Sequence, residues 1–284
     1  MIENQMKIIK SPLELKKNLD KKENIFLIPT MGNLHEGHLS LIKEAKKLSL
    51  NIVLTIFINP IQFNSKNDLN NYPRTLSQDI NLLNDKGVSV LFIPSVKDIY
   101  PKKPKLSYKM PLISNQLCGK SRKGHFKGVI TIIDKLFNLI MPSYAIFGKK
   151  DYQQLYLIKK FVFDSKLPIK IIEAKTIRSK NNLALSSRNS LLNKNDINKA
   201  SSLYKQLKIC AESVIKGLDI NKSELKAKQE LMLEGWKIDY FEIRRRMDLK
   251  KPSYNDKNLV VLGAAFLGEV RLIDNVEFCI PTTN

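Results

Sequence analysis

Apolar residues in the first part of the chain form short blocks that alternate with longer amphipathic segments. The blocks have the length of buried strands, and strands are predicted at residues 25–29, 52–57, 88–93, 144–148 and 169–173. The segments between them have helical spacing, and helices are predicted at residues 12–21, 38–48, 75–86, 128–140 and 153–163. Strands that alternate with helices predict an α/β fold, a parallel sheet with helices on both faces.

The pattern changes near residue 175. Two long amphipathic segments, residues 194–217 and 222–235, are predicted as helices. Short apolar runs follow them, and strands are predicted at residues 238–243, 258–263 and 269–274. This grouping indicates a second, smaller α/β or α+β domain. We therefore expect one domain at residues 1–175 and another at residues 176–284.

Two polar segments of the first domain have no clear period. Residues 59–73 form a loop that is too long for a simple connection, which favours a lid or binding loop. Residues 101–125 are rich in Pro, Lys, Ser and Gly and are expected to be irregular. In parallel sheets ligands collect at the carboxyl ends of strands, so the candidate chemistry is sought in the turns that follow the strands.

The composition is that of a globular chain without a membrane segment. Of the 284 residues 43% are hydrophobic and 26% are charged, and the longest apolar runs, such as residues 52–58, are far shorter than a bilayer-spanning helix. Residues 1–5 are polar and do not resemble a signal peptide. Cys118, Cys210 and Cys279 are odd in number and far apart, which predicts free thiols and a cytoplasmic location.

The formal net charge of +21 raises the question of nucleic-acid binding. The lysines are scattered, however, and the longest basic cluster is the short run Arg244, Arg245 and Arg246. We therefore expect no nucleic-acid partner. A positive field favours anionic substrates instead, such as ATP and a carboxylate.

The turn after the strand predicted at residues 25–29 holds two of the three histidines. Residues 29–38 read Pro-Thr-Met-Gly-Asn-Leu-His-Glu-Gly-His, with His35 and His38 at the start of a predicted helix. Glycines let the backbone approach a phosphate, free N–H groups at the helix start point toward it, and imidazoles can donate to its oxygens. His-x-Gly-His in this context indicates nucleotidyl transfer. A zinc site is disfavoured, because His125 is distant in sequence and no cysteine is near.

An ordered set of stretches resembles the pantothenate synthetase family, also called pantoate–β-alanine ligases, of the His-x-Gly-His nucleotidyltransferase superfamily. The stretches are residues 29–38, 57–63, 72–76, 124–129, 147–155 and 183–189. The resemblance covers residues 25–190 and continues more weakly to the last strands. It implies a Rossmann-like parallel-sheet nucleotidyltransferase domain, which binds ATP and pantoate, and a smaller C-terminal lid domain.

The resemblance also implies an enzymatic reaction. Pantoate and ATP would form pantoyl adenylate and pyrophosphate, and β-alanine would then displace AMP to give pantothenate. Mg²⁺ is expected with ATP, and a homodimer is expected with its contact near residues 101–125. Asp79 is a candidate Mg²⁺ ligand, but the sequence does not establish one. The competing hypothesis is a simple nucleotidyltransferase that adenylates a phosphate ester, which would leave Gln62 and Gln154 without a role.

The resemblance assigns catalysis to His35, His38 and Lys150, with His38 as the proton donor. It places ATP against Met31, Gly32, Asn33, Leu34, His35, Glu36, Gly37 and His38, against Gly148, Lys149, Lys150 and Asp151, and against Ile177, Leu185, Ser186, Ser187 and Arg188. Two hydroxyls and a guanidinium suit the oxygens of the leaving pyrophosphate. A helix N-cap is the alternative for Asp151, and a surface position is the alternative for Lys150.

Gln62, Gln154 and Arg122 are assigned to the substrate by the same resemblance. An amide can donate to a carboxylate and accept from a hydroxyl, which suits a hydroxy acid such as pantoate. For Arg122 a structural role is the open alternative.

Other positions depart from the family pattern. Lys149 replaces an acid, Lys123 replaces a proline and Asn182 replaces a glycine. If Lys149 offers only its backbone to adenosine, its change is harmless. Asparagine tolerates a left-handed backbone, so the turn at Asn182 is expected to be kept.

Overall fold

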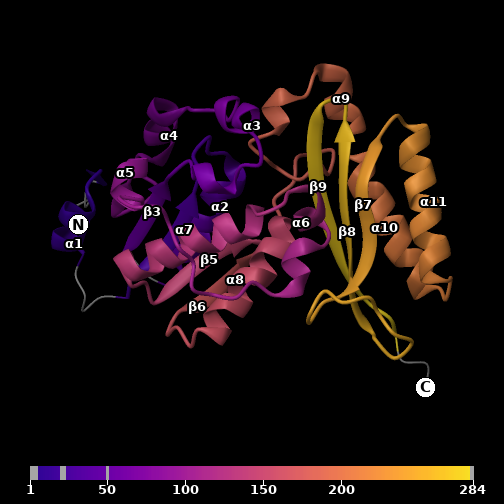
Figure 1. Ribbon diagram of the computed structural model, residues 1–284. Coiled ribbons are helices and arrows are strands. Elements are labelled where there is room, and N and C mark those ends of the chain that lie inside the picture. Colours follow the sequence, from indigo (N-terminus) through magenta and orange to yellow (C-terminus); the bar gives the residue numbers. More distant parts are fainter. Residues whose placement is uncertain (1–5, 20–23, 49–50, 282–284) are drawn as a thin grey trace.

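A parallel sheet forms the first part of the molecule, in a computed structural model that describes residues 6–19, 24–48 and 51–281 (Figure 1). Within these residues the sheet has six strands in the order β1-β4-β3-β2-β5-β6, and all neighbours are parallel. The strands are β1 (Lys7–Ile9), β2 (Phe26–Thr30), β3 (Ile52–Ile56), β4 (Val90–Phe92), β5 (Tyr144–Gly148) and β6 (Lys170–Ala174). The predicted α/β fold is confirmed.

Helices cover both faces of this sheet because alternate strand residues are apolar on each face. Leu27 and Val53 pack in one core with α7 and α8, whereas Phe26 and Ile28 pack in another core with α2. The longer helices of this part are α1 (Pro12–Asn18), α2 (Glu36–Lys46), α4 (Leu76–Leu83), α7 (His125–Ile140) and α8 (Tyr152–Asp164). Their order along the chain follows the predicted alternation.

A smaller antiparallel sheet forms the second part of the molecule, shown in orange and yellow in Figure 1. Its order is β7-β8-β9, with β7 at Lys237–Arg245, β8 at Asn258–Leu267 and β9 at Val270–Cys279. One face packs on α10 (Ser202–Ile215) and α11 (Ile220–Leu233), which together with the strands form a separate core. Of the two predicted alternatives, this part is therefore α+β.

The other face of the small sheet packs against the first part of the molecule. Val260 and Leu262 of β8 belong to the core of α7 and α8, whereas Leu259 and Val261 belong to the core of α10 and α11. The strand is therefore buried on both sides, which explains its long apolar run. The division at residue 175 and the role of the second part as a lid stay predictions.

Several local predictions differ from the structure. The short strand β1 is absent from the prediction because three residues give no measurable period. The helix predicted at residues 12–21 ends at Asn18, and residues 20–23 lie outside the described part. The helix predicted at residues 194–217 is broken into α9 (Lys194–Lys199) and α10.

The two segments expected to be polar loops or irregular contain short helices. These are η1 (Pro60–Gln62), α3 (Lys66–Asn70), η2 (Leu112–Asn115) and α6 (Cys118–Ser121), while α5 (Val96–Ile99) follows β4. The remaining short elements are η3 (Lys149–Asp151) after β5 and η4 (Asn189–Leu191) before α9. Elements of one turn have too few residues to show an amphipathic pattern.

The strand order places a topological switch point between β2 and β5. From β2 the chain adds β3 and β4 on one side, whereas β5 and β6 lie on the other side. The turns that follow β2 and β5 therefore meet at the carboxyl edge of the sheet, where parallel sheets bind ligands. In the ranges that the structure describes, no helix combines the length and the apolar content needed to cross a membrane.

Candidate active site

A cavity of about 300 Å³ opens at this switch point, and both parts of the molecule line it. The structure brings together most of the residues assigned to the site from the sequence. Those that line the cavity are Met31, His35, Gly37, His38, Gln62, Arg122, Gly148, Lys150, Asp151, Gln154, Ile177, Leu185, Ser186, Ser187 and Arg188. Those that lie outside its lining are Gly32, Asn33, Leu34, Glu36 and Lys149.

The turn after β2 is held by a buried carboxylate. Asp79 on α4 accepts hydrogen bonds from the backbone N–H of Asn33 at 2.9 Å and of Leu34 at 2.8 Å. Gly32 has a φ of 80°, and an added Cβ would lie 3.1 Å from Asp79 Oδ2. Asp79 is 3% exposed and does not line the cavity, so it orders the turn instead of serving as the Mg²⁺ ligand considered from the sequence.

The two histidines of the turn are fixed as donors toward the cavity. His35 is the N-cap of α2, and its Nδ1 accepts from the Gly37 N–H at 3.0 Å. Nδ1 of His38 accepts from the His35 N–H at 3.3 Å, which completes a capping box. Because both Nδ1 atoms accept, each neutral ring carries its proton on Nε2. Two Nε2–H groups are therefore available at the positive end of α2.

Burial keeps both imidazoles neutral. Desolvation lowers the pKa of His38 from 6.5 to about 3, and the nearby His35 and Lys150 act in the same direction. Desolvation and Lys150 lower the pKa of His35 to about 4, although Asp151 opposes them. At neutral pH the ligand-free histidines are hydrogen-bond donors without a positive charge.

We expect none of the three histidines to titrate between pH 5.5 and 8 in the ligand-free protein. Burial, together with the charge of Arg122, also lowers the pKa of His125 to about 3. The measurement is a pH series of imidazole ¹H–¹³C NMR spectra, with the urea-unfolded chain as the control that titrates near pH 6.5. A folded-state midpoint near 6.5 for His38 would contradict its burial.

The same shifts make the fold sensitive to acid. Each folded pKa lies below the unfolded value, so the unfolded chain binds more protons as pH falls from about 6.5 toward 3. For the buried His38 and His125 each pH unit in this window costs at most about 1.4 kcal/mol per group. The free energy of unfolding should therefore fall below pH 6.5 and be less steep in a His125→Gln variant.

The turn after β5 separates the two neighbouring lysines. Lys150 lines the cavity, whereas the Lys149 Nζ lies outside the lining, 2.8 Å from Glu277 of β9 and 3.4 Å from Glu173 of β6. The Lys149 side chain therefore does not line the cavity. Any contact of Lys149 with ATP would have to come from its backbone. Asp151 makes no side-chain hydrogen bond as the N-cap of α8, so the alternative of a simple cap is not supported.

The serine–arginine turn, residues 186–188, contacts the turn after β2. Ser187 Oγ donates to the carbonyl oxygen of Asn33 at 3.1 Å, and Asn33 Nδ2 donates to the Ser187 carbonyl oxygen at 3.2 Å. Asn33 thus lies outside the cavity but joins two of its walls. Asn182 has a φ of 69°, so asparagine keeps the left-handed turn as expected.

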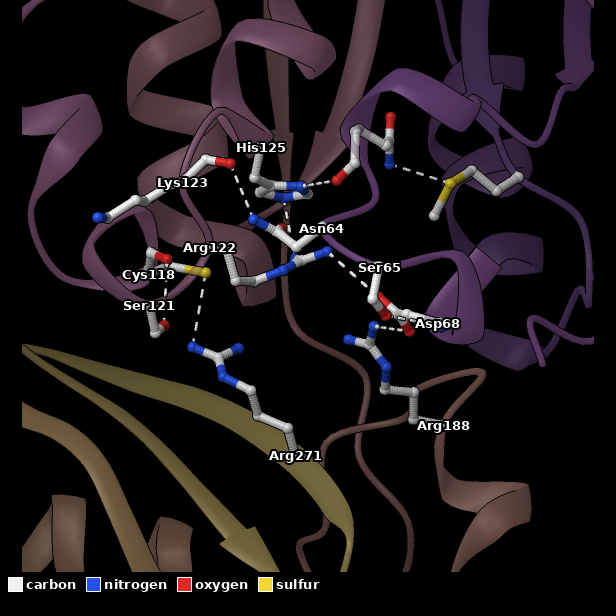
Figure 2. Close-up of polar contacts among 12 residues, drawn as sticks. Asn64, Ser65, Asp68, Cys118, Ser121, Arg122, Lys123, His125, Arg188 and Arg271 are labelled. Carbon is white, nitrogen blue, oxygen red and sulfur yellow. Dashed lines mark hydrogen bonds and ion pairs between the residues drawn. The ribbon is translucent and has the colours of Figure 1, made fainter. Parts of the chain in front are cut away.

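Arg122 lies between His125 and Asp68 and contacts both side chains (Figure 2). Its Nη1 donates to His125 Nε2 at 3.0 Å, so His125 Nδ1 carries the proton and donates to the Gln62 carbonyl oxygen at 2.7 Å. Arg122 and Arg188 both face Asp68 of α3, at 4.0 and 3.4 Å. Arg122 therefore has structural partners and also lines the cavity, and its contact with substrate stays a prediction.

The neighbouring glutamines of α8 have different surroundings. Gln153 is buried, and its amide binds three backbone groups, those of Cys118, Ile113 and Gln116. Gln154 lies in the cavity wall instead. Gln62 also lines the cavity, and its Nε2 donates to the weak acceptor Met31 Sδ at 3.0 Å. Among the described residues, Gln62 and Gln154 are therefore the two glutamines in the lining of the cavity.

Sequence reasoning missed several residues of the cavity. Tyr72 reaches Ser187, and burial raises its pKa. Arg271 of β9 lines the cavity while its guanidinium binds Asp239 at 2.6 Å. The quoted stretch around Tyr72 could have indicated its role, but Arg271 stands in an ordinary strand pattern. The apolar wall includes Val129, Ile132, Ile133 and Leu136, which the sequence pattern placed in a predicted helix without a role in the site.

The fold and the site together indicate the class of protein. They are those of a parallel-sheet nucleotidyltransferase with a His-x-Gly-His turn at its switch point. The Pantoate-beta-alanine ligase family matches residues 4–277. Pantothenate synthetase of Neisseria meningitidis serogroup B is 46% identical over 278 residues, which cover 97% of this chain and 100% of the relative. Pantothenate synthetase of Idiomarina loihiensis is 44% identical over 274 residues, with 96% and 98% covered.

Solved structures agree with these relatives. Pantothenate synthetase from Thermus thermophilus has a TM-score of 0.89 and 34% identity, with 96% of this chain and 99% of that chain covered. The pantoate-beta-alanine ligase from Francisella tularensis, complexed with beta-gamma ATP and beta-alanine, has a TM-score of 0.80 and 38% identity, with 96% and 97% covered. The chain belongs to the pantoate–β-alanine ligase family and is an enzyme.

Proposed function

We propose that this ligase makes pantothenate in two steps within the cavity at the switch point. In the first step a carboxylate oxygen of pantoate attacks the α-phosphorus of ATP, and the bond to the bridging oxygen breaks to release pyrophosphate. In the second step the amine of β-alanine attacks the acyl carbon of pantoyl adenylate, loses a proton and displaces AMP. One observation carries the proposal: phosphate donors and substrate amides share the cavity.

The phosphate donors stabilise the charge that develops in the first step. Nε2–H of His35 and of His38 would donate to phosphate oxygens, and the Lys150 ammonium would neutralise negative charge beside them. The low pKa of His38 keeps its imidazole neutral at neutral pH. A neutral imidazole donates a hydrogen bond readily but is a poor proton donor, so the low pKa supports hydrogen bonding to the phosphates in place of proton transfer. Arg188 and the hydroxyls of Ser186 and Ser187 would contact the same phosphates.

The other part of the cavity has the chemistry of pantoate. Pantoate carries a carboxylate, two hydroxyls and a quaternary carbon with two methyl groups. Gln62 and Gln154 can donate to the carboxylate and exchange hydrogen bonds with the hydroxyls. The two methyl groups would pack on Val129, Ile132 and Ile133 of α7.

Mg²⁺ fits this site as part of the substrate MgATP. No group of three His, Cys, Asp or Glu side chains gathers to hold a metal in the described ranges 6–19, 24–48 and 51–281. The cavity carboxylates are Asp151 and Asp274, and Arg178 already binds Asp274. Mg²⁺ commonly binds through one or two carboxylates together with phosphates and waters, so Asp151 is the side chain that would meet it.

Isotope exchange tests the proposal. The purified chain should exchange labelled pyrophosphate into ATP only when pantoate is present, and added β-alanine should then produce AMP and pantothenate in equal amounts. An acid without the two methyl groups, such as glycerate, is the matched control and should support little exchange. Exchange that does not depend on pantoate would contradict the substrate, and AMP release without an amide product would contradict the second step.

We also propose a homodimer that forms through residues 101–125 and the helix that follows them. Leu112 of this segment is 84% exposed, and Met141 at the end of α7 is 59% exposed. Light scattering at micromolar concentration should give a particle of about twice the 32.6 kDa chain mass. A 32.6 kDa particle would contradict the proposal.

A cytoplasmic location is the remaining proposal. All three cysteines lie in the described part of the chain and are free thiols, with Cys118 and Cys210 buried and Cys279 exposed. Free thiols are typical of a reducing compartment, which supports this location.

A further inference from the structure

β9 carries neighbouring side chains that hold two different parts of the cavity. The Asp274 carboxylate accepts two hydrogen bonds from Arg178, which precedes the serine–arginine turn, at 2.5 and 2.8 Å. The next residue, Asn275, contacts the lysine turn, residues 148–151, which follows β5. Two adjacent residues of β9 thus contact both segments. Asp274 binds Arg178 ahead of the serine–arginine turn, and Asn275 binds the lysine turn.

The side-chain amide of Asn275 donates hydrogen bonds to the backbone of the lysine turn. Its Nδ2 donates to the carbonyl oxygen of Lys149 at 2.9 Å and to that of Lys150 at 3.0 Å. The side chain is buried, with 8% of the residue exposed, and it does not line the cavity. Asn275 belongs to the small antiparallel sheet, whereas the turn belongs to the parallel sheet. These hydrogen bonds therefore join the two parts of the molecule directly at the backbone of Lys150.

The side chains of the lysine turn leave the backbone at Lys150 without a cap hydrogen bond, because the ion pairs of Lys149 with Glu277 and Glu173 involve its ammonium. Gly148 begins the 3-10 turn and Asp151 precedes α8, and neither position makes a side-chain cap hydrogen bond. A lysine side chain is long and flexible, so its ammonium is placed reproducibly only when the backbone that carries it is fixed. The amide of Asn275 supplies that constraint at Lys150 itself.

We propose that Asn275 is a positioning residue for adenylation. Its amide fixes the lysine turn so that the Lys150 ammonium meets the phosphates of ATP. Asn275 touches no substrate, and its effect passes through the carbonyl groups of Lys149 and Lys150. This inference rests on the proposed function, because the phosphate contact of Lys150 is part of that proposal.

A double-mutant cycle tests this role. Asn275→Ala should lower kcat/KM for pantoate-dependent pyrophosphate exchange roughly 10- to 100-fold, because a displaced catalytic group costs that much. In a Lys150→Ala background the same change should cost less than about twofold, because the group it positions is gone. The melting temperature should fall equally in both backgrounds. An equal loss of exchange activity in both backgrounds would overturn the proposal and leave Asn275 a structural residue.

Two further variants serve as a control and as an alternative. Asn258→Ala removes an exposed asparagine from the neighbouring strand β8 and should change neither exchange nor melting temperature. If Asn275→Ala does not fold, Asn275→Ser gives the same cycle with one donor kept and a smaller expected coupling.

The cycle also separates this inference from the proposed function. If the parent exchanges pyrophosphate without pantoate, the proposed function fails. The same cycle is then measured by calorimetry of ATP binding, where coupling between Asn275 and Lys150 would still support the inference. Additive effects there would overturn it.

Discussion

Replacement of His38 with alanine is expected to slow pantoate-dependent adenylation about 10²–10³-fold, the usual cost of one donor to transition-state charge. The Nε2–H of this ring lies at the start of α2, where its orientation is set by the His35 N–H. The measurement is pyrophosphate exchange at saturating ATP and pantoate. Because the ring also completes the capping box, a loss of stability of about 1 kcal/mol is expected and should be measured by thermal unfolding.

A second substitution separates the two roles that His38 can have. Glutamine at position 38 carries an N–H donor near the place of the imidazole Nε2 but cannot transfer a proton. If His38 donates a hydrogen bond, as its low pKa indicates, His38→Gln should keep clearly more activity than His38→Ala. Equal inactivity of the two variants would favour the proton-donor role that the family resemblance assigns. An alanine variant within a few-fold of the parent would refute both roles.

The second large effect is expected at Lys150, with its neighbour as the matched control. Lys150→Ala should lower adenylation about 10²–10³-fold, because it removes the cation beside the two histidines. Lys149→Ala removes the same side chain one residue earlier, where it contacts Glu277 and Glu173 outside the cavity. It should stay within about threefold of the parent in rate and lose about 1 kcal/mol or less of stability.

The pair of variants decides where the phosphate contact lies. Both lysines are single positive charges in a chain with a net charge of +21, so a general electrostatic effect on ATP would be equal for the two. A rate loss at Lys150 alone identifies a local contact. Comparable losses in both variants at low ionic strength, which disappear at high salt, would show that the positive field acts without a specific contact.

Much of the fold was predictable because long elements carry periodic patterns. The strand predicted at residues 144–148 agrees with β5, and the alternation of strands and helices indicated the fold class. The helix at residues 128–140 begins three residues earlier, at His125, because Gly124 has a φ of 79° and allows a sharp entry. Short elements were missed because a turn of helix has no period to detect.

The candidate site was only partly predictable, because neighbours in sequence can face opposite ways. Lys149 and Lys150 are identical in type, yet one contacts Glu277 and the other lines the cavity. Gln153 and Gln154 differ in the same way, since Gln153 binds the backbone around Cys118. A sequence pattern gives the kind of side chain, but its direction depends on the turn and on the elements packed around it.

The sequence by itself determined the alternating α/β pattern, the His-x-Gly-His turn at a helix start and the chemistry that these residues can perform. These properties are local, because they depend on the period of apolar residues and on short motifs. Tertiary structure alone decided that β2 and β5 are neighbours, that Asp79 orders the turn and that Asn275 holds the backbone of Lys150. Asp79 is 46 positions from Asn33, and Asn275 is 125 positions from Lys150. Such contacts depend on packing between distant elements, which no local pattern records.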